Sequence, residues 1–198
     1  MVKRVFDCLC VILAAPVWVP VLGLVSLISL CVQGRPLLFT QARAGRNAVP
    51  FHLYKLRTMC AGSGTDEERL TRFGRFLRQT SLDELPQLLN VLKGEMTLVG
   101  PRPLPMIYVE RYSPEQRHRL DVLPGLTGLA QIKGRNSLTW DEKFAYDLEY
   151  VRRRSFAFDC LILIQTVLVV VFHRGINASA HETMPEFNPT DAKSRKDA

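Results

Sequence analysis

The stretch SLDELPQLLNVLKGEMTLVGPRPLP, residues 81–105, contains a predicted helix start followed by a proline-rich turn. We expect the rest of the chain to be organised around this stretch. Ser81 followed by Glu84 has the pattern of a capping box, so we predict a helix that begins close to Ser81, with Pro86 in its first turn. Apolar residues recur behind it at helical spacing: Leu85, Leu88, Leu89 and Leu92. At a helix start the unpaired amides and the dipole favour negative charge, so Asp83 and Glu84 are expected to be ionised near neutral pH.

These residue types can carry chemistry. An ionised Asp83 can act as a nucleophile, and an ionised Glu84 can bind a hard divalent cation. The alternative is that both acids only cap the helix. Arg102 lies between two prolines that stiffen the backbone, and a stiffly held guanidinium suits a phosphate. The alternative for Arg102 is a solvated turn residue.

The N-terminal segment is predicted to enter lipid. No charge occurs from Cys8 to Gln33, which exceeds the roughly 20 residues that a spanning helix needs. Pro16 and Pro20 would kink this helix. Basic residues flank it on both sides: Lys3, Arg4, Arg35, Arg43 and Arg46. If positive flanks stay in the cytoplasm, both ends lie on one side, so we favour a re-entrant helix over a straight span or a cleaved signal peptide.

The remaining chain is predicted to form a helix-dominated α+β domain. Residues 36–41 and 50–58 flank a loop and are expected to form a short β-hairpin. The loop and second strand carry basic residues: Arg43, Arg46, Lys55 and Arg57. These charges are candidates for contact with lipid headgroups or substrate phosphate, and Lys55 is taken as a candidate substrate-binding residue. The alternative is a solvated edge strand protected by charge.

Amphipathic and apolar helices are expected after the hairpin. We predict one helix over 65–80, begun by Thr65 and Glu68, whose arginine run suits an anionic membrane surface. Capped helices are also predicted over 113–123 and 139–154. Between them, residues 123–136 are expected to form a short strand between two glycine turns. Residues 155–174 should form a buried or interfacial helix. The predicted organisation is a re-entrant membrane segment 1–34, a membrane-associated catalytic domain 35–176 and a polar tail 177–198.

Composition limits the class of partner. The net charge of +7 indicates an anionic partner, which could be nucleic acid, phospholipid or a phosphorylated substrate. Nucleic acid is disfavoured because no recognition module occurs and the arginines lie beside apolar stretches. The five cysteines show no metal-type spacing and indicate free thiols in a reducing compartment. The four histidines are dispersed, so no zinc site is expected.

Several distinct motifs follow one another along the chain: KRVFD before the apolar segment, FTQARAGRNAVPFHLYKLRTM, LRQTSLDELPQLLNVLKGEMTLVGPRP, LPGLTGLAQIKGRN, KFAYDLEYV and TMPEF. In this order they resemble a known family, the small monotopic phosphoglycosyl transferases of bacteria, also called bacterial sugar transferases. One departure occurs in the membrane helix, where many relatives have Ser-Pro and this chain has Ala15-Pro16. The resemblance implies a re-entrant hairpin in the bacterial inner membrane and a catalytic domain on its cytoplasmic face.

The resemblance also implies an activity. It implies transfer of a sugar-1-phosphate from a UDP-sugar to polyprenol phosphate, with release of UMP, as the first membrane step of glycan assembly such as exopolysaccharide or O-antigen. Asp83 would be the nucleophile, and Glu84 would help to hold Mg²⁺. Arg78, Arg102 and Arg135 would bind phosphates or the nucleotide. Asp147 would orient one of these arginines, or form a structural ion pair with Arg135.

One rival interpretation is a non-catalytic membrane anchor that binds anionic lipid and assembly partners. It explains the apolar segment and the positive charge, but it leaves the acid pair and the stiff Arg102 without a purpose. The UDP-sugar and the oligomeric state are not fixed by the sequence, so a homo-oligomer stays open.

Overall fold

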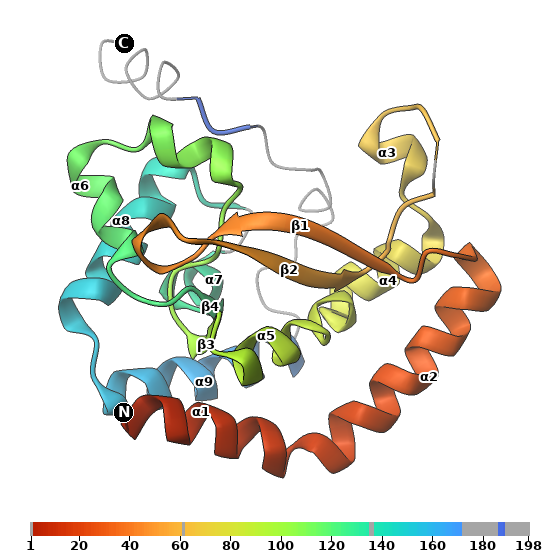
Figure 1. The fold of residues 1–198 in the computed structure, drawn as a ribbon, viewed down its shortest axis with the longest axis horizontal. Coiled ribbons are helices and arrows are strands. Elements are labelled where there is room, and N and C mark those ends of the chain that lie inside the picture. Colours follow the sequence, from red (N-terminus) through yellow and green to blue (C-terminus); the bar gives the residue numbers. More distant parts are fainter. Residues whose placement is uncertain (1, 61, 135–136, 172–185, 189–198) are drawn as a thin grey trace. The chain divides into compact units, whose positions relative to one another are not determined.

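A computed structural model of the chain describes residues 2–60, 62–134, 137–171 and 186–188 (Figure 1). It confirms a helix-dominated α+β chain with an apolar N-terminal helix and two small sheets. The chain divides into two compact units that interleave along the sequence. The described parts of residues 1–41 and 52–97 belong to the first unit, and those of 42–51, 98–175 and 184–198 belong to the second.

The N-terminal apolar segment forms two helices that meet at a bend. They are α1 (Val2–Leu13) and α2 (Ala15–Gln33), with Ala14 between them (Figure 1). Pro16 has no N–H to donate and stands at the start of α2. The Trp18 indole Nε1–H donates across the bend to the Val11 carbonyl at 2.9 Å. The break between the helices thus lies just before Pro16, whereas Pro20 lies inside α2, and the re-entrant course through a membrane stays a prediction.

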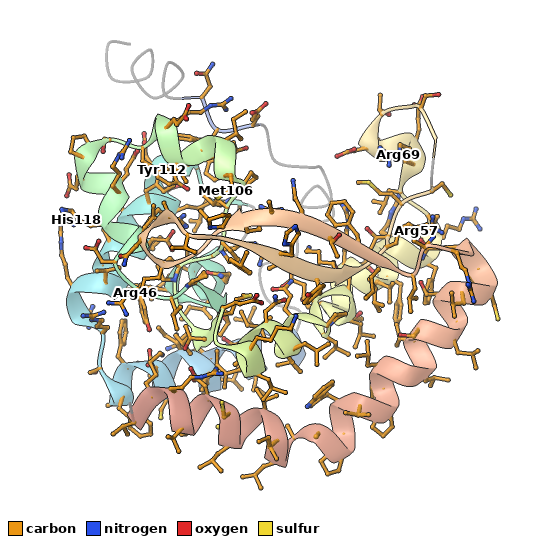
Figure 2. All side chains as sticks on the ribbon, in the orientation of Figure 1. Arg46, Arg57, Arg69, Met106, Tyr112 and His118 are labelled. Carbon is orange, nitrogen blue, oxygen red and sulfur yellow. The ribbon has the colours of Figure 1, made fainter. Side chains whose placement is uncertain are left out.

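Among the described residues, α2 is the one helix long and apolar enough to cross a membrane. Many of its large apolar side chains are exposed, including Val17, Leu24, Leu27 and Val32. Figure 2 shows side chains projecting along the outer side of the α1–α2 pair. The Arg57 guanidinium donates to the carbonyls of Gln33 and, at 3.0 Å, Gly34, so it caps the C-terminal end of α2 (Figure 2).

The other helical elements of the first unit are α3 (Asp66–Arg69), α4 (Arg72–Thr80), the 3-10 turn η2 (Leu82–Glu84) and α5 (Gln87–Lys93). The Thr65–Glu68 capping box is confirmed. The single helix predicted over 65–80 is wrong in one respect, because the chain is extended at Leu70 and Thr71. Thr71 caps α4 by accepting the Gly74 N–H at 2.7 Å.

The helix predicted to begin at Ser81 begins later. Ser81 is left-handed, with φ 59°, and ends α4, and its side chain makes no capping hydrogen bond to the following turn. Pro86 explains the difference. In a helix capped at Ser81, Pro86 would fall beyond the first turn. Pro86 has no N–H to donate to the Leu82 carbonyl, and its ring would clash with that carbonyl. The chain instead makes 3-10 turns until α5 starts at Gln87.

The predicted β-hairpin is confirmed. Strands β1 (Leu38–Ala44) and β2 (Pro50–Leu56) pair, with the short turn η1 (Arg46–Ala48) at the tip. The tip belongs to the second unit and the base to the first.

Strand β3 (Thr97–Val99) pairs with β4 (Gly125–Thr127), and apart from Thr97 the residues of both strands belong to the second unit. Besides η1, the described part of the second unit contains η3 (Met106–Arg111), α6 (Pro114–Arg117), η4 (His118–Leu120), α7 (Leu129–Lys133), α8 (Trp140–Arg153) and α9 (Phe156–Val171). The capping boxes predicted at Ser113 and Thr139 are confirmed. Helix α7 was not predicted. The core gathers buried aromatic side chains: Tyr108, Tyr112, Phe144 and Phe187.

Candidate active site

Asp83 and Glu84 lie in η2 and share one cation. The Lys55 Nζ lies 3.3 Å from Asp83 Oδ2 and 3.3 Å from Glu84 Oε1. The Asp83 side chain is only 4% exposed, against 16% for Glu84 and 22% for Lys55. A buried carboxylate needs a compensating charge, and Lys55 supplies one for both acids.

The local sequence explains why these side chains meet. Leu56 follows Lys55 on β2, and Leu82 precedes Asp83 in η2. Leu56 is buried in a cluster with Leu77, and Leu82 packs against that cluster. Burial of the two apolar neighbours therefore brings the lysine and the carboxylates together.

Asn90 joins the strand that carries Lys55 to the helix that follows the acid pair. Its side chain is fully buried. Its amide nitrogen donates to the His52 carbonyl at 2.8 Å and to Glu95 Oε2 at 2.7 Å, while its oxygen accepts the Tyr54 N–H at 3.2 Å. One side chain on α5 thus binds the backbone of β2 at two points, next to Lys55.

Helix α1 is fastened to the same helix. Arg4 donates to the carbonyls of Val91 and, at 2.6 Å, Leu92 at the end of α5. Asp7 is buried and accepts a hydrogen bond from the Thr97 hydroxyl. These contacts explain why a charged KRVFD motif stands at the start of the apolar segment.

Arg78 lies in the last turn of α4, just before η2. Its Nε donates to Thr58 Oγ1 at 3.1 Å. Gly74 allows this arrangement, because a Cβ at that position would lie 1.8 Å from the Thr58 carbonyl oxygen.

Arg102 lies in the second unit, in a turn whose backbone is held at both ends. The Gly125 N–H donates to the Pro101 carbonyl at 2.9 Å, and the Ala44 N–H donates to the Leu104 carbonyl at 3.0 Å. Prolines at 101, 103 and 105 have no N–H. The carbonyls of this turn are therefore held by donors from other segments.

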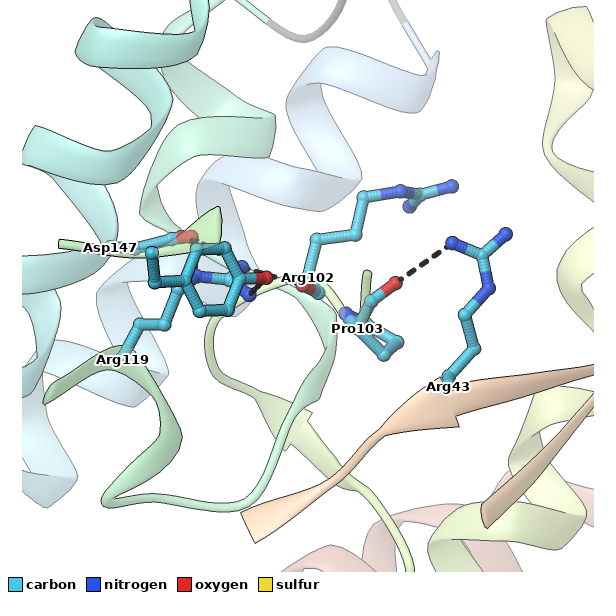
Figure 3. Close-up of polar contacts among 6 residues, drawn as sticks. Arg43, Arg102, Pro103, Arg119 and Asp147 are labelled. Carbon is cyan, nitrogen blue, oxygen red and sulfur yellow. Dashed lines mark hydrogen bonds and ion pairs between the residues drawn. The ribbon is translucent and has the colours of Figure 1, made fainter. Parts of the chain in front are cut away.

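Two guanidinium groups hold the middle of the turn (Figure 3). Arg119 Nη2 donates to the Arg102 carbonyl at 2.7 Å, and Arg43 Nη1 contacts the Pro103 carbonyl at 3.4 Å. Arg119 is buried and pairs with Asp147, whose Oδ2 lies 3.1 Å from Nε and 2.7 Å from Nη2. Its Nη1 donates to the Tyr112 hydroxyl at 3.0 Å.

Burial and neighbouring charges shift the pKa values of these groups. Burial raises the pKa of the Asp147 carboxyl, and the charge of Arg119 opposes that rise. Burial works against the charge of Arg119, but Asp147 and Tyr112 outweigh it and raise the pKa of the guanidinium. Lys143, one helical turn before Asp147 on α8, has a pKa lowered to about 8, first by burial and then by the charge of Arg102.

Comparison with known proteins decides the family. The family model for bacterial sugar transferases matches residues 1–173. The chain belongs to this family. The resemblance seen in its motifs is thereby confirmed.

Relatives of this bacterial sugar transferase cover most of its length. The sugar transferase EpsL of Bacillus subtilis (strain 168) is 44% identical over 94% of this chain and 96% of its own. The UDP-glucose:undecaprenyl-phosphate glucose-1-phosphate transferase of Caulobacter vibrioides is 41% identical over 83% of this chain and 68% of its own. The exopolysaccharide production protein ExoY of Sinorhizobium fredii is 36% identical over 87% of both chains.

The structure distributes the predicted site residues of this sugar transferase between its units. Asp83, Glu84, Lys55 and Arg78 belong to the first unit, and Arg102 and Asp147 belong to the second. Arg135 lies outside the described residues. The first unit brings the acid pair and Lys55 together, and the second places Asp147 against Arg119.

The acid pair fits a magnesium ion. Mg²⁺ is usually bound by one or two carboxylates together with substrate phosphates. Glu84 would supply such a carboxylate beside Asp83, and both acids face the cation of Lys55. No group of three or more metal-binding side chains occurs in the described part of the chain, so the remaining ligands would come from the substrate and water.

Arg119 and Asn90 were not predicted from the sequence. No pattern separates buried Arg119 from exposed Arg117 two positions earlier. Asp147 did carry a signal, since it shares the apolar face of its helix with Phe144 and Leu148. A carboxylate on such a face needs a buried partner, which the structure identifies as Arg119.

Proposed function

We propose that this bacterial sugar transferase moves a sugar-1-phosphate from a UDP-sugar to polyprenol phosphate through a covalent intermediate on Asp83. The observation that carries this proposal is the buried Asp83 carboxylate beside Glu84 and Lys55, in a chain related to a transferase named for this reaction. Transfer to a lipid phosphate also agrees with the exposed apolar surface of α2.

The reaction takes two displacements. Asp83 Oδ attacks the β-phosphorus of the UDP-sugar, and the bond from that phosphorus to the bridging oxygen breaks. UMP leaves with the bonding electrons, and the phosphosugar remains on the aspartyl oxygen. A phosphate oxygen of the polyprenol phosphate then attacks the same phosphorus. The Asp83–phosphorus bond breaks, which gives polyprenyl-diphosphate-sugar and restores the carboxylate.

The neighbours of Asp83 have separate roles. Lys55 balances the buried acids before the substrate arrives and then contacts the oxygens of the diphosphate. Glu84 would hold Mg²⁺, which supplies charge neutralisation for the diphosphate when it is bound. Arg78, Arg102 and Arg135 bind phosphates or the nucleotide. The acceptor phosphate is itself ionised, so no histidine base is needed.

We also propose the location of this chemistry. The N-terminal helices re-enter the bacterial inner membrane, and the catalytic residues stay on its cytoplasmic face. Basic residues on both flanks of the apolar segment support this orientation.

The experiment is a UMP-release assay on detergent-solubilised protein with Mg²⁺ and polyprenol phosphate. UDP-glucose and UDP-galactose are tested because relatives are named for these sugars, together with their N-acetylated counterparts. One donor should support steady UMP release. Asp83→Asn should lower it by on the order of 10⁴-fold, whereas Asp66→Asn, at an exposed acid in α3, should not. Full activity in Asp83→Asn would exclude the proposed mechanism.

A further inference from the structure

The Pro-Arg-Pro turn has few backbone donors of its own, because its prolines lack N–H groups. The four carbonyls of residues 101–104 are bonded by groups from other segments. Backbone amides bond the first and last of these carbonyls. Guanidinium groups contact the middle two, those of Arg102 and Pro103. The orientation of the Arg102 backbone therefore depends on a side chain that is distant in sequence.

That side chain is Arg119, and its geometry leaves little freedom. Its Nη2 lies 2.7 Å from the Arg102 carbonyl and 2.7 Å from Asp147 Oδ2, so each of its two hydrogens has one acceptor. Nε bonds the same carboxylate, and Nη1 bonds Tyr112. A guanidinium bonded at three nitrogens in a buried place is a rigid support.

We propose that Arg119, held by Asp147, is a positioning residue that sets the direction of the Arg102 side chain toward a phosphate of the substrate. This inference rests on the proposed function, in which Arg102 binds phosphate. In Figure 3 the Arg102 side chain runs away from Asp147 and Arg119, toward the side where the Arg43 guanidinium lies. Arg119 thus bonds the backbone carbonyl of Arg102, while the Arg102 guanidinium points away from Arg119.

Because of the prolines, a contact with the Arg102 backbone also sets the direction of the Arg102 side chain. Pro101 and Pro103 fix their own φ angles, and Pro103 also restricts the ψ angle of Arg102. A shift of the Arg102 carbonyl therefore moves the Cα–Cβ direction rather than being absorbed by neighbouring torsions. A misplacement of about 1 Å in a phosphate-binding group can lower a rate by ~10- to 100-fold.

A double-mutant cycle tests this proposal. Asp147→Asn keeps the shape of the side chain but removes the negative charge that pairs with Arg119. We expect it to lower kcat/KM for the UDP-sugar by ~10- to 100-fold when Arg102 is present. In an Arg102→Ala background the same change should lower kcat/KM by no more than about twofold, because the side chain that Arg119 positions is absent.

Tyr112→Phe provides a milder variant in case Asp147→Asn folds poorly. It removes the hydroxyl that bonds Arg119 Nη1 and keeps the aromatic contact with Phe144. Its smaller loss should likewise disappear in the Arg102→Ala background. The control is Glu115→Gln, which breaks the exposed Glu115–Arg152 pair of the same unit and should change nothing.

Two outcomes would overturn the positioning role. One is that the losses caused by Asp147→Asn and Tyr112→Phe persist undiminished in Arg102→Ala. The other is that Arg102→Ala retains full kcat/KM. Asp83→Asn, measured in the same assay, separates this failure from failure of the proposed function. If Asp83→Asn abolishes transfer, the function stands even where the positioning role falls.

Discussion

Lys55 faces both of the acids that the proposed mechanism uses, each at 3.3 Å. Its removal leaves the buried Asp83 carboxylate without this cation, and it also removes a positive charge from the diphosphate site. We therefore expect Lys55→Met to lower kcat by ~100- to 1000-fold, the range typical for loss of one electrostatic contact to a transition state. Lys55→Arg should recover part of this loss because it restores the charge. UMP release under saturating donor is the measurement.

Lys93→Met is the matched control for this prediction. Lys93 also belongs to the first unit, but it is bonded to the Tyr54 hydroxyl at 2.7 Å rather than to the acids. Its loss should leave kcat within about twofold of the parent, as for a surface change away from the site. Equal losses in Lys55→Met and Lys93→Met would show that general positive charge, not the contact with Asp83, matters.

Lys143 provides a prediction about pH. Burial, followed by the charge of Arg102, lowers the pKa of Lys143 from 10.5 to about 8 in the folded protein. The charged form of Lys143 therefore lowers the free energy of unfolding. This destabilisation is complete below about pH 8 and disappears as the pH rises from about 8 to 10.5. Lys143→Met should raise the unfolding temperature at pH 7, and its advantage should shrink as the pH rises past 8.

Thermal unfolding in detergent between pH 6.5 and pH 10 checks the Lys143 prediction. Lys133→Met, at an exposed lysine at the end of α7, controls for the substitution itself. The prediction is contradicted if Lys143→Met does not raise the unfolding temperature at neutral pH, or if the difference from the parent grows with pH. Either result would show that the charge of Lys143 does not destabilise the folded protein.

At the scale of elements, helix α4 depends on a close approach to the backbone of Thr58. In Gly74→Ala the added Cβ would lie 1.8 Å from the Thr58 carbonyl oxygen, so α4 must shift and the Arg78–Thr58 contact with it. We expect a loss of ~3 kcal/mol in stability, at the upper range for overpacking, and reduced transfer activity.

Gly23→Ala is the control for the change at Gly74. Gly23 is also helical, and its added Cβ would meet no atom within 4 Å. Alanine has the higher helix propensity, so this variant should be neutral or gain up to about 1 kcal/mol. Chemical unfolding of the two variants checks the contrast. The prediction fails if Gly74→Ala unfolds like the parent.

The helix starts show which elements were predictable from the sequence. Four of the predicted helix starts have Ser or Thr followed three residues later by Glu or Gln, and three of these starts form capping boxes: Thr65, Ser113 and Thr139. The fourth, at Ser81, fails because Pro86 stops the helix from starting there. The local pattern was the same in all four, and a single proline five positions further on decided the outcome.

The site shows the same limit in another form. Asp83, Glu84 and Arg102 were found because their neighbours in sequence mark them. Arg119 and Asn90 were not found, since their roles come from burial against segments 17 and 38 residues away. Such partners follow from packing, and no spacing in one segment reveals them.

At the scale of the whole molecule, the order of motifs was enough to identify the family, but the two interleaved units were not visible in the sequence. Residues 42–51 belong with the described residues of the range 98–175, and the described segments on either side of 42–51 belong to the other unit. The division into 1–34, 35–176 and 177–198 follows the order of the sequence and stays a prediction, whereas the units follow contacts between segments that are distant in sequence.

The membrane topology gives a prediction at this scale. If α1 and α2 re-enter the inner membrane, positions before and after them face the cytoplasm. In a variant without native cysteines, Lys3→Cys and Arg35→Cys should both resist a membrane-impermeant thiol reagent in intact bacterial cells with a permeabilised outer membrane. Both should react after lysis. Reaction of one position in intact cells would indicate a straight span instead.

The central claim is that Asp83 carries the phosphosugar between donor and acceptor. The most direct measurement omits polyprenol phosphate and combines rapid-quench UMP detection with mass spectrometry of the enzyme peptides. We expect a burst of UMP that approaches one equivalent per active enzyme, and a phosphosugar adduct on the peptide that contains Asp83. Absence of UMP release until the lipid acceptor is added, or an adduct on a different side chain, would contradict the claim.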